Sequence, residues 1–237
     1  MIKEIFKKIK NKIIRKKIES IQLINKRSKG HYKRLIFYKN QGINLKRILD
    51  IGACNGLWSK MFKDAFPESD ILMIEANSNK EEILRKIGKY KIALLGSEQD
   101  KEVNYYKSFN NDSGNSIYLE NTKYLFKPEK RKITTLKSLL DKDYFDLIKM
   151  DVQGSELDII KGGLDIVMNS RFLLLELQTL EYNKGAPRIE DVIKFLKNIN
   201  FEFIDVFDLL YSANGSLVQL DGFFINKKIN TSKILID

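Results

Sequence analysis

Short apolar runs alternate with longer helical stretches in the chain from Arg47 onward. The runs are too uniformly apolar to leave one side in water, which is typical of strands buried on both faces. Strands and helices in alternation predict an α/β domain, with a mainly parallel sheet that helices cover on both sides. The predicted strands are residues 47–51, 70–75, 91–95, 146–150, 172–177, 201–207 and 219–225. The predicted helices are residues 57–66, 79–88, 136–140, 155–169 and 189–198.

Residues 104–131 interrupt this alternation. They are rich in Asn, Ser, Lys and Tyr, and we interpret them as a long excursion over the edge of the sheet where ligands bind. No internal repeat or low-complexity linker divides the chain. We therefore predict one domain, residues 47–237, preceded by an arm, residues 1–46.

The first part of this arm, residues 1–28, carries a different pattern. Apolar residues recur every three or four positions from Ile2 to Ile24, with lysines and arginines between them. This period predicts a helix with one apolar stripe and a cationic opposite face. Three interpretations stay open: the stripe packs on the domain or on a second subunit, the helix lies on an anionic membrane surface, or the arm binds nucleic acid.

Positive charge is concentrated in the same arm. Residues 1–47 contain 16 Lys and Arg and 2 acids, whereas the remainder of the 237-residue chain contains 26 basic and 29 acidic residues. A catalytic face that gripped nucleic acid along its length would carry its own basic excess. Nucleic acid is therefore not the favoured substrate.

Composition also excludes several classes of protein and of site. No apolar run exceeds four residues, whereas a membrane span needs roughly 20, and the basic start reaches no apolar region typical of a secretory signal. We therefore expect a cytoplasmic protein, in contact with the inner face of the membrane if residues 1–28 bind there. The single cysteine, Cys54, and the single histidine, His31, exclude an internal disulfide and a zinc site with the usual four ligands.

A glycine-containing turn follows the first predicted strand, where residues 48–56 read ILDIGACNG. Gly52 and Gly56 let the backbone turn sharply and approach a ligand closely, and the next helix presents its N-terminal amides there. The second strand ends in an acid, Glu75, whose carboxylate is placed to accept both hydroxyls of a ribose. An ordinary strand–helix turn is the alternative, but the second acid makes nucleoside binding the better interpretation.

The same turn discriminates between two nucleoside ligands. A dinucleotide fold needs Gly-x-Gly-x-x-Gly against a pyrophosphate, but Asp50 stands where the first glycine would fall. An acid disfavours a diphosphate and favours a cationic ligand. S-adenosylmethionine contains a ribose, an ammonium group and a sulfonium but no phosphate, so the turn favours it over NAD.

With its later motifs, the sequence resembles the FkbM-type methyltransferases, a branch of the class I S-adenosylmethionine-dependent enzymes. The resemblance spans roughly residues 48–226. It is carried by DIGACNG at residues 50–56, by EAN at residues 75–77 and above all by IKMDVQGSEL at residues 148–157. Supporting matches are the loop at residues 111–116, TTL at residues 134–136 and QLDGFF at residues 219–224. Many family members have Glu in place of Gln153 and Asn in place of Cys54.

The resemblance implies a Rossmann-like sheet in the strand order 3-2-1-4-5-7-6, with the last strand antiparallel and helices on both faces. The cofactor would lie across the carboxyl ends of strands one, two and four. Glu75 would bind the ribose, and Asp151 would face the space where methyl donor and acceptor meet. The cofactor-binding residues expected are Asp50, Gly52, Ala53, Cys54, Asn55, Gly56, Glu75, Ala76, Leu95, Gly96 and Asp151, with Ser97 beside the adenine.

Methyl transfer to an alcohol requires that the hydroxyl proton leave, and a positioned base contributes roughly 10²–10⁴-fold. We rank Asp151 first, Glu156 second and His31 third as this base, because His31 lies in the arm, outside the resemblance. Asp151 and Glu156 could also form the N-cap and polar first turn of a helix. Oxygen atoms of Asp151, Glu156 and Asp112 could hold Mg²⁺, but nothing in their spacing singles them out, so a metal is not required.

The acceptor can be narrowed by exclusion. The chain lacks the Pro-Pro-aromatic stretch that typically follows the fourth strand of amino-methylating nucleic-acid enzymes, and Cys54 is committed to the cofactor turn. The family's usual acceptor is a hydroxyl on a sugar, glycan or polyketide-type small molecule, and the tyrosines and amides of residues 104–124 suit a sugar. We therefore predict O-methylation of a saccharide, glycan or related small molecule. If the sugar is carried on a lipid, binding of the cationic arm to the membrane would bring the enzyme to its substrate.

Two alternatives from other classes remain. One is an RNA methyltransferase that uses the basic arm as its electrostatic grip, and the other is a cofactor-binding protein without catalysis. The formation of a homo-oligomer also stays open.

Overall fold

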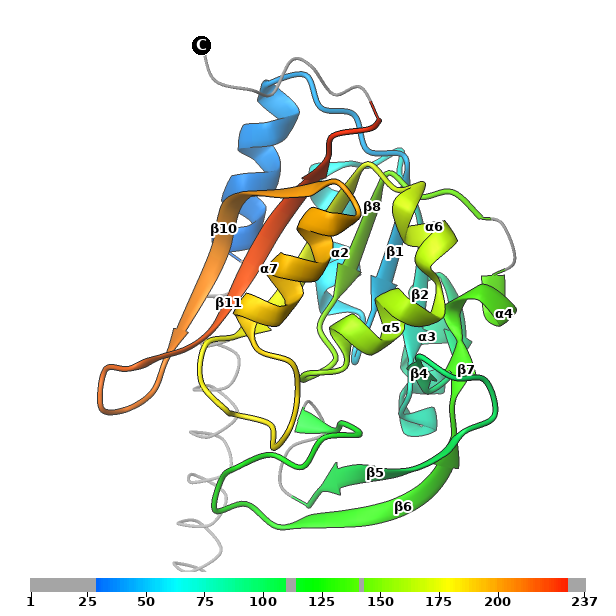
Figure 1. Cartoon of the computed structure of the whole chain (residues 1–237). Coiled ribbons are helices and arrows are strands. Elements are labelled where there is room, and N and C mark those ends of the chain that lie inside the picture. The colour runs from blue at the N-terminus through cyan, green and yellow to red at the C-terminus, as the bar shows by residue number, and fades with distance from the viewer. Residues whose placement is uncertain (1–28, 110–113, 141–142, 230–237) are drawn as a thin grey trace, which may run out of the picture.

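The computed structural model describes residues 29–109, 114–140 and 143–229. Its main element is a sheet of seven strands in the order β10-β11-β9-β8-β1-β2-β3. β11 is antiparallel to both of its neighbours, and the other adjacent pairs are parallel. Numbered along the chain, this is the order 3-2-1-4-5-7-6, so the predicted Rossmann-like fold is confirmed (Figure 1). The strands are β1 (Arg47–Ile51), β2 (Asp70–Glu75), β3 (Lys89–Ile92), β8 (Leu147–Met150), β9 (Phe172–Gln178), β10 (Phe201–Tyr211) and β11 (Leu217–Asn226).

Helices cover both faces of this sheet because its central strands are apolar on both sides. On one face lie the helix formed by residues 29–40, then α2 and α3. On the other face lie α4, α5, α6 and α7 (Figure 1). Their bounds are α2 (Leu57–Ala65), α3 (Glu81–Arg85), α4 (Leu136–Leu140), α5 (Glu156–Gly162), α6 (Leu164–Met168) and α7 (Ile189–Asn198), with a short 3₁₀ helix η1 (Ser78–Lys80) before α3.

The core consists of two layers, one on each side of the sheet. β9 contributes to both, because Leu173 and Leu175 face the layer under α4–α7 while Phe172 and Leu174 face the layer under residues 29–40. Leu35 belongs to the second layer, so the helix of residues 29–40 packs on the sheet. The predicted amphipathic helix of residues 1–28 lies outside the described residues.

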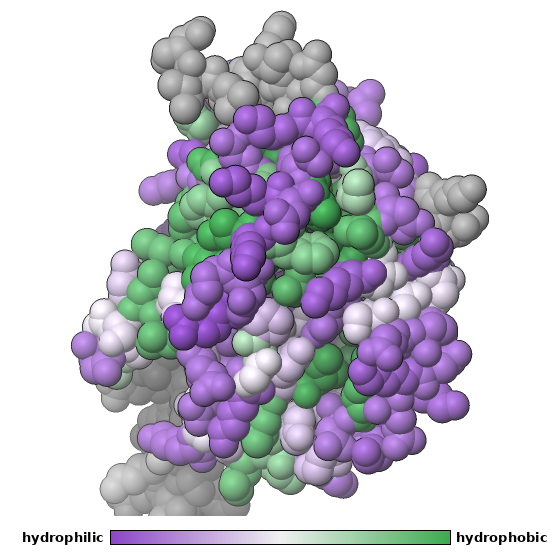
Figure 2. Space-filling model, viewed as in Figure 1, coloured by the Kyte–Doolittle hydropathy of each residue, from purple (hydrophilic) through white to green (hydrophobic). Residues whose placement is uncertain are grey.

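Charged and polar side chains dominate the face of the molecule seen in Figure 2, with apolar areas between them. No helix in the described part of the chain is both long enough and apolar enough to cross a membrane.

The strand predicted at residues 91–95 is two separate strands. β3 ends at Ile92, and the chain then leaves the edge of the main sheet. β4 (Leu95–Gly96) pairs instead with β7 (Thr134–Thr135) in a small parallel sheet. The amide of Thr134 donates a hydrogen bond to the carbonyl of Leu94 at 2.8 Å, which supports this second pairing.

The helix predicted at residues 155–169 is broken into α5 and α6 at two glycines. A Cβ at Gly162 would lie 2.0 Å from the carbonyl oxygen of Gly96, and a Cβ at Gly163 would lie 2.6 Å from the side chain of Leu136. The glycines therefore let α5 pass directly over β4 and α4. The apolar period alone does not reveal this contact.

The excursion predicted at residues 104–131 contains an antiparallel hairpin. β5 (Glu102–Ser108) pairs with β6 (Phe126–Lys132), and the two strands lie beyond the carboxyl ends of the main sheet (Figure 1). This hairpin, with the segment after β5, forms the outer wall of the site described next.

Candidate active site

A cavity that is open to solvent lies where β1, β2 and β8 end. The turns after these three strands form its inner wall, and the β5–β6 hairpin with residues 115–117 forms its outer wall. Carboxyl ends of parallel strands are the usual ligand-binding edge of such a sheet. The lining residues are Ile51, Gly52, Cys54, Ile74, Glu75, Ala76, Ala93, Leu94, Leu95, Tyr105, Asn115, Ser116, Ile117, Asp151, Val152, Gln153, Ser155 and Ile159.

The turn after β1 passes unusually close to the end of β8. Gly52 has a φ of +77°, and a Cβ there would lie 1.9 Å from the carbonyl oxygen of Asp151. No side chain fits in that space, so glycine is required at this position. The close approach brings Cys54 and Asp151 to the same cavity.

Glu75 ties the same turn to the end of β2. Its Oε2 accepts a hydrogen bond from the amide of Cys54 at 2.7 Å, and its Oε1 accepts one from the amide of Asn77 at 2.7 Å. Burial raises the pKa of the Glu75 carboxyl, while these amides oppose the rise. The side chain thus has a structural role in addition to forming part of the cavity wall.

The cavity has an acidic character. Among the lining residues that the structure describes, the ones with charged side chains are Glu75 and Asp151, both acids. Such a wall repels a diphosphate and attracts a cation. The arrangement agrees with the ligand preference inferred from Asp50, although that residue lies behind the wall.

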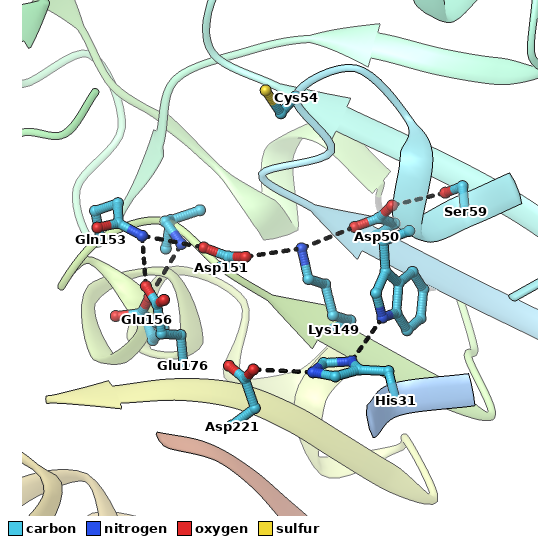
Figure 3. A network of polar contacts seen from close by, with 12 residues as sticks. His31, Asp50, Cys54, Ser59, Lys149, Asp151, Gln153, Glu156, Glu176 and Asp221 are labelled. Carbon is cyan, nitrogen blue, oxygen red and sulfur yellow. Dashed lines mark hydrogen bonds and ion pairs between the residues drawn. The ribbon is translucent and has the colours of Figure 1, made fainter. Parts of the chain in front are cut away.

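Asp151 is held on both carboxylate oxygens and still reaches the cavity. Its Oδ2 lies 3.6 Å from Lys149 Nζ, and its Oδ1 accepts a hydrogen bond from Gln153 Nε2 at 3.2 Å (Figure 3). The side chain is 35% exposed. A carboxylate that is oriented and accessible can accept a proton from a bound molecule.

Gln153 joins two acids. Its Nε2 also donates to Glu176 Oε2 on β9, at 2.5 Å. An amide nitrogen donates hydrogen bonds, whereas an ionised carboxylate only accepts them. The amide therefore lets Asp151 and Glu176 stand side by side, and a glutamate at position 153 would add a third acid.

Lys149 lies at the centre of the polar network beneath the cavity. Its ammonium is 3.3 Å from Asp50 Oδ1 and 3.6 Å from Asp151 Oδ2, and Ser59 donates to Asp50 Oδ2 at 2.6 Å. Burial alone would lower the pKa of Lys149, but the carboxylates of Asp50, Asp151 and Asp221 outweigh it and raise that pKa. Lys149 therefore stays charged and neutralises the fully buried Asp50.

His31 lies deeper in the same network and not at the cavity. Its Nδ1 accepts a hydrogen bond from the indole of Trp58 at 3.1 Å, and its Nε2 is 2.9 Å from Asp221 Oδ2 on β11 (Figure 3). The histidine is 6% exposed. Both ring nitrogens are bonded within the protein, so the structure does not bring His31 to the expected reaction space.

Glu156 is also turned away from the cavity. Its Oε1 accepts a hydrogen bond from the amide of Val152 at 3.0 Å, across the turn that precedes α5. Burial raises the pKa of the Glu156 carboxyl to about 8. The carboxyl thus stabilises the loop that carries Asp151 and Gln153, in the manner of a helix-capping acid.

Part of the predicted cofactor set reaches the cavity and part supports it from behind. Of the predicted residues, those that line the cavity are Gly52, Cys54, Glu75, Ala76, Leu95 and Asp151, whereas Asp50, Ala53, Asn55, Gly56, Gly96 and Ser97 do not. Ala53 packs with Met73 and Leu84. A Cβ at Gly56 would meet Ile87 at 2.5 Å, so that glycine permits packing on α3.

Several residues of the outer wall were not among the predicted site residues. Tyr105, Asn115 and Ser116 line the cavity, and Ser116 donates to the carbonyl of Gln153 at 2.8 Å. Arg131 on β6 donates to the carbonyl of Ala76 at 2.5 Å and lies 5.0 Å from the Tyr105 ring centroid. The sequence held two signals for this wall: the polar, tyrosine-rich composition of residues 104–131, and the resemblance to the family at residues 111–116, which include Asn115 and Ser116.

No metal site is evident in the described part of the chain. No group of three or more His, Cys, Asp or Glu side chains there is arranged to hold an ion. Asp112, one of the residues considered for Mg²⁺, lies outside the described residues.

Comparisons with known proteins agree with the motifs. A family model described as Methyltransferase FkbM domain matches residues 50–203, more than half of the chain. No curated protein sequence matches the chain.

Three similar solved structures are remote in sequence. Magnesium protoporphyrin IX methyltransferase from Synechocystis PCC 6803, solved with bound SAM, has 10% identity and a TM-score of 0.49, covering 83% of this chain and 80% of that one. An S-adenosylmethionine-dependent methyltransferase from Clostridium acetobutylicum has 9% identity and a TM-score of 0.47, covering 83% and 91%. Precorrin-6y C5,15-methyltransferase from Geobacter metallireducens has 10% identity and a TM-score of 0.45, covering 82% and 87%.

Proposed function

Because the chain belongs to the FkbM family of class I, S-adenosylmethionine-dependent methyltransferases, we propose that it O-methylates a hydroxyl group of a saccharide, glycan or related small molecule. The observation that carries this proposal is the cavity at the ends of β1, β2 and β8, whose charged wall residues are Glu75 and Asp151. Glu75 suits a ribose, and Asp151 suits a positively charged centre with an alcohol beside it.

The residues of the cavity fit the proposed cofactor. The glycine at position 52 lets the turn after β1 pass against the backbone of Asp151, and this contact brings the turn and Asp151 to the same cavity. Glu75 is fixed by two amides and has remaining lone pairs to accept ribose hydroxyls. Ala93, Leu94, Leu95 and Ile159 offer apolar surface for an adenine. When bound, S-adenosylmethionine supplies an electrophilic methyl group and leaves as a neutral thioether.

Asp151 is the proposed base. It is the accessible carboxylate of the network, and Lys149 and Gln153 hold its two oxygens in place. In this role Asp151 accepts the proton of the acceptor hydroxyl, while the walls of the cavity align the hydroxyl oxygen and exclude water. Glu156 supports the loop and His31 the network beneath it, so neither is needed as the proton acceptor.

The outer wall supports a polar, hydroxyl-rich acceptor. Tyr105, Asn115 and Ser116 lie at the cavity beside Asp151 and Gln153. Rings, amides and hydroxyls are the groups that hold a sugar by stacking and by many hydrogen bonds.

Mass spectrometry of cell glycans, with and without the protein, tests this function. A product should appear that is heavier by about 14 mass units, one added CH₂ group. Asp151→Asn should reduce its formation by about 10²–10⁴-fold, while S-adenosylhomocysteine affinity changes little. Asp165→Asn, an exposed acid on α6 paired with Lys137, serves as the matched control and should keep full activity. A folded Asp151→Asn protein with normal turnover would remove Asp151 as the base, and methylated RNA with unmodified glycans would favour the RNA alternative.

A further inference from the structure

The only histidine of the chain is buried in a hydrogen-bonded cluster outside the residues that the family model matches. His31 lies on the helix of residues 29–40, and its partner Asp221 lies on β11. The family model matches residues 50–203 and includes neither residue, although Asp221 lies in the QLDGFF segment at residues 219–224, which also resembles the family. Asp221 is 7% exposed. The burial of this carboxylate and this imidazole calls for a physical reason, because burying an ionised group is costly without a partner.

Trp58 determines the chemical form of His31. An indole N–H can only donate, so the Nδ1 atom at 3.1 Å must accept. The proton of the neutral ring therefore resides on Nε2, which donates to Asp221 Oδ2 at 2.9 Å. A second proton on Nδ1 would face the indole N–H, donor against donor. His31 is thus held as a fixed donor to Asp221 and has no free lone pair for a substrate proton.

One contact connects this cluster to Lys149, and the pairing of β11 with β9 connects it to Asp151. The Trp58 ring that donates to His31 also lies beside the Lys149 ammonium, with 5.8 Å between Nζ and the ring centroid. Figure 3 shows the His31 and Asp221 side chains on one side of Lys149, and Asp50 and Asp151 on the other. Asp221 is also directly opposite Glu176 in the β11–β9 register, and Glu176 shares the Gln153 amide with Asp151.

We propose that His31 and Asp221 position Lys149 and, through it, the carboxylate of Asp151. By donating to Asp221, His31 holds that carboxylate away from Lys149, so the ammonium stays between Asp50 and Asp151. Without the donor, Asp221 draws Lys149 toward itself, and Asp151 loses the cation that fixes its Oδ2. The helix of residues 29–40 is in this sense part of the active site, although none of its residues lines the cavity.

Two amide variants separate this role from others. In His31→Gln the side chain is long enough for its nitrogen to donate to Asp221 and its oxygen to accept from Trp58. In His31→Asn the same amide is one carbon shorter and cannot span both partners. A positioning role predicts that Gln rescues and Asn does not, whereas a proton-accepting role predicts that both fail.

The readout is the ratio of affinities for S-adenosylmethionine and S-adenosylhomocysteine, measured by calorimetry without an acceptor. The two ligands differ by the methyl group and its positive charge, so the ratio reports how well Asp151 faces that charge. This inference rests on the proposed function. Asp151→Asn lacks the carboxylate altogether, so it gives the lowest ratio of S-adenosylmethionine affinity to S-adenosylhomocysteine affinity that we expect. We expect the wild-type ratio in His31→Gln, and in His31→Asn a fall of about threefold or more toward the Asp151→Asn value, with S-adenosylhomocysteine affinity unchanged.

The outcomes distinguish failure of this inference from failure of the proposed function. A wild-type chain that binds neither ligand overturns the proposed function and the positioning role with it. Normal binding with an unchanged ratio in His31→Asn, or a loss in His31→Gln equal to that in His31→Asn, overturns the positioning role alone. Thermal unfolding establishes that each variant is folded.

A spectroscopic measurement covers the case in which His31→Asn does not fold. Because the chain has one histidine, long-range ¹H–¹⁵N spectra of the wild type report a single imidazole. We expect the Nε2–H form alone, and a shift of its ¹⁵N resonances in Asp151→Asn because Lys149 relocates. An Nδ1–H form, or ¹⁵N resonances of His31 that are the same in Asp151→Asn as in the wild type, would overturn the connection between His31 and Asp151.

Discussion

Single charged residues within otherwise apolar strands mark the site. Lys149 interrupts β8, Glu176 interrupts β9 and Asp221 interrupts β11, and all three are buried. A buried ion costs several kcal/mol unless it is paired. Lys149 is paired with Asp50 and Asp151, Asp221 is paired with His31, and Glu176 accepts a hydrogen bond from Gln153 Nε2. Apolar residues at the same positions would extend the core, so we expect these charged residues to be kept for the site at the strand ends.

Glu156 makes stability depend on pH in a defined direction. Its pKa is raised from 4.5 to about 8 in the folded protein, so the folded state holds a proton that the unfolded state has released between these values. Its contribution to stability is complete below about pH 4.5 and is lost as the pH rises through about 8. Glu156→Gln keeps the acceptor for Val152 without the charge.

Denaturant unfolding should therefore show Glu156→Gln and wild type equally stable near pH 5. At pH 9 the variant should be more stable by about 2–4 kcal/mol. Glu190→Gln, an exposed acid in the first turn of α7, is the control and should leave the pH profile unchanged. A Glu156→Gln protein that loses stability with rising pH as the wild type does would show that Glu156 is ionised in the fold.

Gln153→Glu tests the amide between the two acids. Three carboxylates would then meet at one point, and one of them must take up a proton. We expect the variant to be less stable than wild type by about 2 kcal/mol at pH 8 and by much less at pH 5. The exposed Gln99→Glu is the control. Equal losses at both pH values would mean that the added charge is not the cause.

At the scale of elements, close backbone approaches decide where the strand ends meet. The turn between β1 and α2 passes over the end of β8 at Gly52, and α5 passes over β4 at Gly162. These approaches place residues that are distant in the sequence at one cavity. Its outer wall is held by two hydrogen bonds, one from Arg131 on β6 to the carbonyl of Ala76 and one from Ser116 to the carbonyl of Gln153.

Two glycines with similar φ angles allow a matched test of the turn. Gly52 has φ +77° and a side chain there would collide with Asp151, whereas Gly185 has φ +74° and a Cβ there would meet no atom within 4 Å. Alanine at Gly185 should cost about 1–2 kcal/mol, the strain of positive φ alone. Alanine at Gly52 should cost at least about 3 kcal/mol and abolish S-adenosylhomocysteine binding. Thermal unfolding and calorimetry measure both, and equal costs would show that the turn can move away from β8.

At the scale of the whole molecule, local patterns were sufficient to predict the strands that carry the motifs, and the resemblance to the family supplied the sheet order. Apolar strands, the turn at residues 50–56 and the block at residues 148–157 are local patterns, and each lies where expected. Asp151, Glu75 and Gly52, three of the predicted site residues, line one cavity, and their roles there stay predictions.

The contacts that depend on packing could not be read from local patterns. The helix break at Gly162 and Gly163 comes from the close packing of α5 on β4 and α4, and the apolar period along the sequence cannot show it. The pairing of His31 with Asp221 joins residues 190 positions apart. The sequence predicted that Asp50 binds the cofactor, but in the structure Asp50 is fully buried and is paired with Lys149.

The uneven charge of the chain leads to a prediction about membranes. Residues 1–47 carry 16 basic and 2 acidic residues, so the full chain should bind vesicles that contain phosphatidylglycerol and not pure phosphatidylcholine. Binding should weaken as salt rises above about 0.1 M. Replacing Lys7, Lys8, Lys16 and Lys17 with Glu should abolish it, and the same change at the exposed Lys86, Lys89, Lys130 and Lys227 should not.

Sedimentation with vesicles measures this binding. Equal binding to neutral vesicles, or loss in both sets of variants, would contradict a membrane role for the arm. Tight, salt-sensitive binding to RNA without vesicle binding would support the RNA alternative instead.

The central claim is that the acidic cavity at the ends of β1, β2 and β8 holds a cationic, phosphate-free nucleoside. Calorimetry of the full chain with S-adenosylmethionine, S-adenosylhomocysteine and NADH tests it most directly. We expect heat of binding with the first two and none with NADH, and a loss of about tenfold or more in affinity for both in Glu75→Gln. Clear binding of NADH, with no heat from either of the other ligands, would contradict the claim.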